Sequence, residues 1–159
     1  MREHNRGFTL IELLITILIA TILLTAAIPS FLSSVHSQQT ANVAQTFVQD
    51  VAWARGQAIS GAAAASLTLS DNCTWDASTG SAADVAHSMS SAQLQSDAPT
   101  LSCTGIPAGG LAFSFDSMGL VDPPPASSSV ITFTPGVGLP VSIEVFGSGV
   151  VVENPTHAS

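Results

Sequence analysis

The chain has 159 residues, enough for one modest domain beside any targeting segment, and it contains neither Lys nor Tyr. Downstream of Gly7, ten Asp or Glu residues face a single strong cation, Arg55, which gives a formal charge of −9. A surface of that sign repels nucleic acid and anionic headgroups, so direct nucleic-acid binding is disfavoured. Abundant Ser, Thr, Ala and Gly with few charges favour an extracytoplasmic, β-rich protein over a cytosolic enzyme.

The first predicted element is an apolar helix over residues 8–28, whose 21 residues suffice to span a bilayer. Arg2 and Arg6 precede this helix, which places the N-terminus in the cytoplasm by the positive-inside rule. The helix nevertheless contains Glu12 close to its start. A carboxylate at the centre of a membrane helix costs about 2.5–3.5 kcal/mol, and somewhat less near its end. This position therefore predicts a compensating partner.

An ordinary secretory signal peptide is the alternative interpretation of the same segment. Small residues around Thr25 and Ala27 resemble a cleavage site, and the mature chain would then begin at Ile28. The apolar region is longer than the usual 7–15 residues, and Glu12 interrupts it. Both features favour a retained anchor over a cleaved signal.

After Pro29, helical periodicity continues to about Ser60, with Gly61 as the expected stop. The predicted helix bends near Pro29, because proline cannot donate the backbone hydrogen bond of a helix interior. Its second half carries an apolar stripe at spacings of three and four, formed by Ala44, Phe47, Val48, Val51, Ala54 and Ala58. Asp50 and the neighbouring Gln residues are assigned mostly to other faces. The stripe predicts packing on a globular domain.

Beyond residue 61 the pattern changes to short β-type segments separated by Gly and Pro. Strands are predicted over 64–70, 111–116, 129–135, 140–146 and 149–153, with a tight hairpin at the Gly-Ser-Gly of residues 147–149. Residues 71–110 are weakly patterned and rich in Ser and Ala, so they are interpreted as a long surface excursion.

Two cysteines, Cys73 and Cys103, stand 30 residues apart. An even pair behind an export-type N-terminus indicates a disulfide formed in an oxidising compartment, with two unrelated buried thiols as the alternative. The four His residues are scattered along the chain, so no metal site and no cofactor are expected.

The N-terminal residues resemble a type IV prepilin signal. The leader MREHNRG followed by FTLIELLITILIA has the family's short basic leader ending in Gly, then Phe, then Glu four residues later. The resemblance implies that prepilin peptidase cuts between Gly7 and Phe8 and methylates the new amino group of Phe8. It further implies that Glu12 pairs with the N-terminal ammonium of a neighbouring subunit, and that Pro29 corresponds to the helix-bending proline common in pilins.

Later segments are similar to those of FimT/FimU-type minor pilins and the related GspH minor pseudopilins. VQDVAWARGQAIS resembles the end of their helix, and IEVFGSGVV resembles their terminal hairpin. LAFSFDSMGLV, with Phe115, Asp116 and Gly119, resembles their strand-and-turn motif. Some FimT-type pilins bind DNA through a basic C-terminal patch, but the tail GVVVENPTHAS contains no Arg or Lys.

These resemblances imply a pilin-like α+β fold, in which a long N-terminal helix packs on a small antiparallel β domain. The expected parts are a leader (1–7), a transmembrane or filament-core helix (8–28), its amphipathic continuation (29–61) and a periplasmic domain with a disulfide-closed loop (62–159). The implied function is a minor pilin, not an enzyme, that initiates or caps a type IV pilus.

The alternatives are a GspH-type pseudopilin of type II secretion and, more distantly, a secreted binding domain. As a pilin, the chain would be anchored in the inner membrane and later enter a surface filament or a periplasmic pseudopilus. Its implied partners are major and minor pilins or pseudopilins, prepilin peptidase and the inner-membrane assembly platform.

Overall fold

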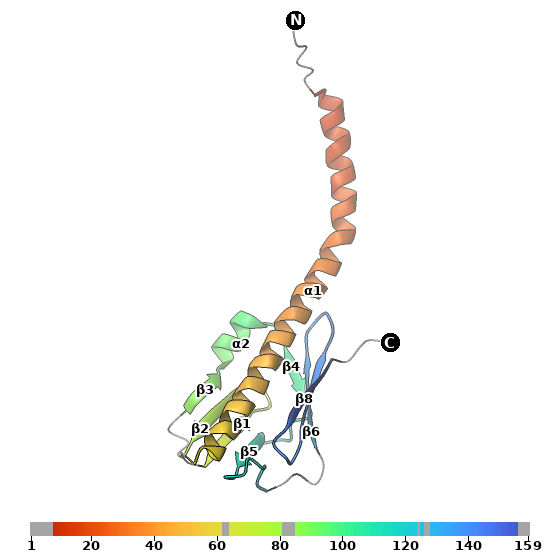
Figure 1. Ribbon diagram of the computed structural model, residues 1–159. Helices are drawn as coiled ribbons and strands as arrows, with labels where there is room; N and C mark the ends of the chain where they lie inside the picture. Colours follow the sequence, from red (N-terminus) through yellow and green to blue (C-terminus); the bar gives the residue numbers. More distant parts are fainter. Residues whose placement is uncertain (1–7, 62–63, 81–84, 124, 126–127, 156–159) are drawn as a thin grey trace, which may run out of the picture.

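The computed structural model describes residues 8–61, 64–80, 85–123, 125 and 128–155, and shows one long helix laid against two small β-sheets (Figure 1). The leader, and with it Gly7, lies outside the described residues. Helix α1 (Leu10–Ile59) has 50 residues and is about 75 Å long at 1.5 Å per residue. Its first half projects away from the rest of the chain, whereas its second half packs on the sheets.

Helix α1 bends by 40° between Thr25 and Ala27. Pro29 has no N–H to donate to the carbonyl of Thr25, and its ring crowds that same carbonyl. A bend one turn before Pro29 follows from this geometry. No described helix is by itself both long and apolar enough to cross a membrane, although the two parts of α1 meet that test together.

The β domain consists of two four-stranded sheets in which all neighbouring strands are antiparallel. The first sheet has the order β3-β2-β1-β5 and contains β1 (Ala65–Leu69), β2 (Trp75–Thr79), β3 (Val85–Met89) and β5 (Leu111–Phe115). The second has the order β4-β6-β7-β8 and contains β4 (Ser102–Thr104), β6 (Ser129–Thr134), β7 (Val141–Val145) and β8 (Val151–Pro155). A short helix, α2 (Ser91–Asp97), precedes β4.

The hydrophobic core lies between α1 and the two sheets. Strand alternation buries one face of each sheet, as at Leu67 in β1 and Ile131 in β6. From the helix, Phe47 contacts the ring of Trp75 edge-on at a centroid distance of 5.3 Å, and the ring of Phe133 at 5.9 Å. Because Trp75 and Phe133 belong to different sheets, Phe47 joins all three layers. The predicted α+β, pilin-like architecture is confirmed.

The prediction that residues 71–110 form a surface excursion is wrong. This segment contributes β2 and β3 to the first sheet, then α2, then β4 to the second sheet. Its strands contain much Ala, Ser and Thr and so carry little β pattern of their own. Pairing with β1 and β6 and burial of Trp75 hold them in place. Cys73 and Cys103 are disulfide-bonded across the segment, with Cα atoms 5.6 Å apart, as predicted.

Candidate functional site

The first half of α1 is almost entirely uncovered by the rest of the chain. Its large apolar side chains remain exposed from Phe8, at 86%, to Phe31, at 68%. Burial by the domain begins further along, and Thr40 is the first fully buried residue of the helix. Such a length of apolar surface is unfavourable in water, so lipid or other helices must cover it.

A capping box formed by Thr9 and Glu12 begins this apolar helix. The Thr9 hydroxyl accepts a hydrogen bond from the Glu12 backbone N–H at 3.3 Å. In return, Glu12 Oε2 accepts from the Thr9 backbone N–H and from the Thr9 hydroxyl, both at 2.9 Å. The carboxylate therefore satisfies donors of the first turn that would otherwise be orphaned. Among the described residues, Glu12 Oε1 has no such partner, which leaves one carboxylate oxygen for a donor from outside the chain.

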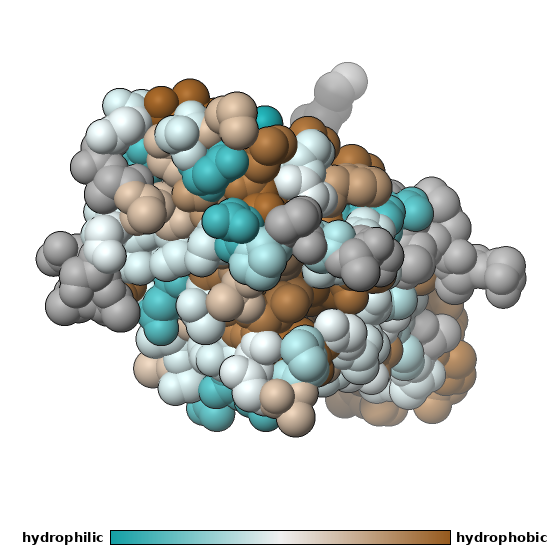
Figure 2. All heavy atoms as spheres, turned by 90° about the horizontal axis from the view of Figure 1, so that it is seen from below, coloured by the Kyte–Doolittle hydropathy of each residue, from teal (hydrophilic) through white to brown (hydrophobic). Residues whose placement is uncertain are grey.

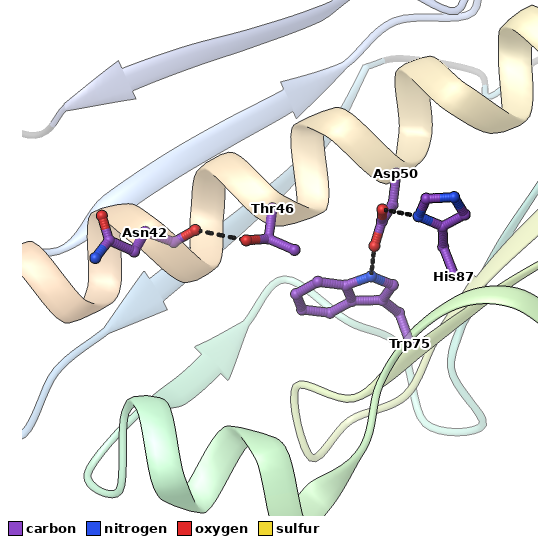
Figure 3. A network of polar contacts seen from close by, with 5 residues as sticks. All are labelled: Asn42, Thr46, Asp50, Trp75 and His87. Atoms are coloured by element: carbon purple, nitrogen blue, oxygen red, sulfur yellow. Dashed lines mark hydrogen bonds and ion pairs between the residues drawn. The ribbon is translucent and has the colours of Figure 1, made fainter.

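A second polar cluster lies inside the domain, where Asp50 of α1 faces the first sheet (Figure 3). Asp50 Oδ2 accepts a hydrogen bond from the indole Nε1 of Trp75 at 2.7 Å, and Oδ1 lies 3.0 Å from Nδ1 of His87. The imidazole of His87 also stacks against Trp53, with ring centroids 4.5 Å apart. Asp50 is buried, Trp75 is buried and His87 is half-exposed. The cluster therefore ties α1 to β2 and β3 by polar contacts.

The assignment of Asp50 to a face away from the apolar stripe is wrong. Asp50 lies three residues after Phe47 and four before Ala54, so it belongs to the buried face of the helix. That spacing was the signal available in the sequence. A buried carboxylate requires hydrogen-bond donors, and Trp75 supplies one from a strand that the pattern did not indicate.

Asp116 and Gly119 form a compact turn directly after Phe115, the last residue of β5. Asp116 Oδ1 accepts from the backbone N–H groups of Met118 and Leu120 at 2.9 and 2.8 Å, while Phe115 is buried in the core. Gly119 adopts a positive φ of 77°, a conformation that suits glycine. Its carbonyl accepts a hydrogen bond of 3.1 Å from Nε of Arg55. The turn thus binds the side chain of Arg55, the single Arg or Lys among the described residues.

No group of three or more His, Cys, Asp or Glu side chains within the described residues is arranged to hold a metal ion.

Comparisons with known proteins match the N-terminal segment by sequence and most of the chain by fold. Residues 2–28 match the prokaryotic N-terminal methylation motif. The crystal structure of the type IV minor pilin FimU of Pseudomonas aeruginosa in space group P21 is similar in fold, with a TM-score of 0.55 and 16% identity over 74% of this chain and 90% of that one. The FimU crystal form in space group P65 aligns with a TM-score of 0.48, at 16% identity over 77% of this chain and 91% of that one. No protein with a curated description matches the sequence. The chain thus combines a methylation motif with a fold like that of FimU.

Proposed function

We propose that this protein is a minor pilin subunit that helps to initiate or cap assembly of a type IV pilus. One observation carries the proposal: the methylation motif stands at the head of a helix whose apolar half the domain leaves bare. Lipid covers such a surface before assembly, and the helices of neighbouring subunits cover it afterwards. The fold shared with FimU supports the same role.

Maturation begins with the leader. Prepilin peptidase cuts between Gly7, which lies outside the described residues, and Phe8, and methylates the new amino group of Phe8. In the filament, Glu12 pairs with that ammonium on a neighbouring subunit. The capping box supports this step because it holds the carboxylate at the tip of the helix through Oε2. Two charges that are each costly in hydrocarbon then neutralise one another only on assembly, which sets the register.

The role is structural rather than enzymatic. The apolar part of α1 anchors the subunit in the inner membrane, with the β domain in the periplasm, where the Cys73–Cys103 disulfide is stable. The partners are major and minor pilins, prepilin peptidase and the assembly platform. In the periplasmic pseudopilus of type II secretion, the same design would serve as a GspH-type subunit.

The N-terminal peptide, identified by mass spectrometry in sheared surface filaments and in membranes, tests the proposal. We expect N-methylated Phe8 in the sheared fraction. If the same terminus is found only in membranes, the proposed function changes from a pilus subunit to a subunit of the secretion pseudopilus. A terminus at Ile28 would instead indicate an ordinary secreted domain and overturn the pilin proposal.

A further inference from the structure

A groove of about 350 Å³ lies between helix α1 and the start of strand β8. Figure 2 views the domain from the end opposite the N-terminus and shows apolar side chains gathered in a central hollow with more polar borders. The residues of the groove wall come from two segments far apart in sequence. They are Val48, Ala52, Arg55, Gly56 and Ile59 on the helix, and residues 149–151 on the hairpin and β8.

Arg55 is the one polar anchor in this apolar groove. Its Nε donates to the carbonyl of Gly119, which fixes the direction of the half-buried side chain. Among the described residues, the two terminal amino groups of its guanidinium have neither an ion pair nor a hydrogen bond. The groove therefore presents a positively charged, oriented guanidinium whose terminal amino groups the described part of the chain leaves unpaired.

The backbone around Arg55 leaves room for the guanidinium. A Cβ on Gly149 would lie 2.9 Å from Nε of Arg55 and 2.3 Å from the carbonyl oxygen of Gly119. A Cβ on Gly119 would lie 3.0 Å from the same nitrogen. By contrast, a Cβ on Gly56 would meet nothing within 4 Å, because Gly56 opens onto the groove. Two glycines thus accommodate the cation, and the third keeps the groove wide.

Exposed apolar side chains continue beyond the groove onto its surroundings. Ile59 and Val150 are exposed within the groove wall itself, and Met118, Leu120 and Val152 are exposed next to Gly119 and Val151 in the chain. Strand β8 is also an edge strand of its sheet, so its outer backbone groups can pair with an added strand. An occupant that matches these features is extended and apolar, and carries one negative charge.

We propose that this groove is the docking site for a different subunit of the same filament, which inserts an extended apolar segment bearing one carboxylate that pairs with Arg55. The inference rests on the proposed pilin function. A second copy of this chain is a poorer occupant, because ten acidic residues against one Arg downstream of Gly7 make two copies repel one another. A partner carboxylate finds its one strong positive contact at Arg55, which fixes how the two domains meet.

The test is photo-cross-linking of the full-length chain in cells that assemble filaments. A photoreactive residue replaces Val150 in the groove wall, and the matched control replaces Val85, which is similarly exposed on β3 at the edge of the other sheet. We expect a cross-link from position 150 to an apolar segment of another pilin, and none to that segment from position 85. Arg55→Glu should lower the yield by about tenfold, and a basic residue in place of the partner's carboxylate should restore it. Arg55→Lys should retain most of the yield.

A second variant tests the groove without touching the charge. Gly56→Phe should fill the groove and abolish the cross-link, whereas Gln93→Phe, on the exposed face of α2, should leave it unchanged. Equal urea midpoints of the full-length variants in detergent would show that folding is preserved. A cross-link to lipid or to another copy of this chain, or a yield indifferent to Arg55→Glu, would overturn the docking proposal. The N-terminal peptide is identified in the same cells. Cleavage before Phe8 without the cross-link would contradict the docking proposal alone, whereas absence of that cleavage would contradict the pilin function.

Discussion

Replacing Asp50 by alanine should destabilise the β domain far more than an ordinary surface substitution. The variant removes the acceptor of the 2.7 Å hydrogen bond from Nε1 of Trp75, and that indole is buried at 1% exposure. A buried donor left without a partner costs about 1–3 kcal/mol. The contact with His87 adds little, because that imidazole is 45% exposed and water can replace the carboxylate. We therefore expect the free energy of unfolding to fall by about 2–3 kcal/mol.

The assay is urea unfolding of the full-length chain in detergent micelles, followed by the fluorescence of its two Trp residues. Asp50→Asn is the matched control, since its amide oxygen can still accept from Trp75, and it should lose only about 1 kcal/mol. His87→Gln should lose less still, because the imidazole is half-exposed. The order of the three midpoints is thus itself a prediction.

A double-mutant cycle isolates the hydrogen bond from the general effect of truncation. Asp50→Leu combined with Trp75→Phe removes donor and acceptor together. The double variant should therefore lose less free energy of unfolding than the sum of the losses of the two single variants. Trp53 remains as the fluorescent reporter. Additive effects, or a loss below about 0.5 kcal/mol for Asp50→Ala, would refute the claim that Asp50 holds the indole in a dry site.

Three further predictions concern other parts of the chain. Gly119→Ala should lower the free energy of unfolding by more than Gly61→Ala in urea titrations. Both glycines have positive φ, but only the new methyl at Gly119 meets neighbouring side chains. Gly61→Ala should therefore lower the free energy of unfolding by only about 1 kcal/mol, and equal losses in the two variants would contradict this. Cys73→Ser with Cys103→Ser should cost about 3–4 kcal/mol, the entropy of a 30-residue loop, and reductant should then leave the urea midpoint unchanged. Glu12→Ala should keep cleavage before Phe8, read by mass spectrometry, yet remove the protein from sheared filaments; normal incorporation would exclude the proposed pairing.

Much of the helical part could be predicted from local sequence. Apolar residues over 8–28 and the stripe through Phe47 indicated a long helix with two different halves, and Gly61 marked its end. These features are readable because a helix satisfies its own backbone, so periodicity and breakers determine it without reference to distant residues. The five predicted strands also form, because their alternating or β-branched residues match the pleat of a sheet. The last one covers Val151–Pro155, two residues later than the predicted 149–153, because the hairpin turn takes up Gly149.

Residues 71–110 show where prediction from local sequence failed. Strand β2 contains Trp75 but otherwise only small or polar residues, and β3 has four exposed residues out of five. Neither segment carries enough apolar pattern to indicate a strand. Each forms because a neighbouring strand supplies its hydrogen bonds and because the disulfide at Cys73 holds the segment to the second sheet.

The sequence by itself determined the long apolar helix, the N-terminal methylation motif with Glu12 and the cysteine pair, because each depends on residues near one another or on residue type alone. Tertiary structure alone decided that Trp75 donates to the buried Asp50, and that Arg55 lies in a groove between α1 and β8 while donating to the turn at Gly119. Those partners are separated by dozens of residues, and packing of α1 against both sheets brings them together. A polar side chain is driven inward only when a distant donor or acceptor offsets its desolvation, and no local pattern records that partner.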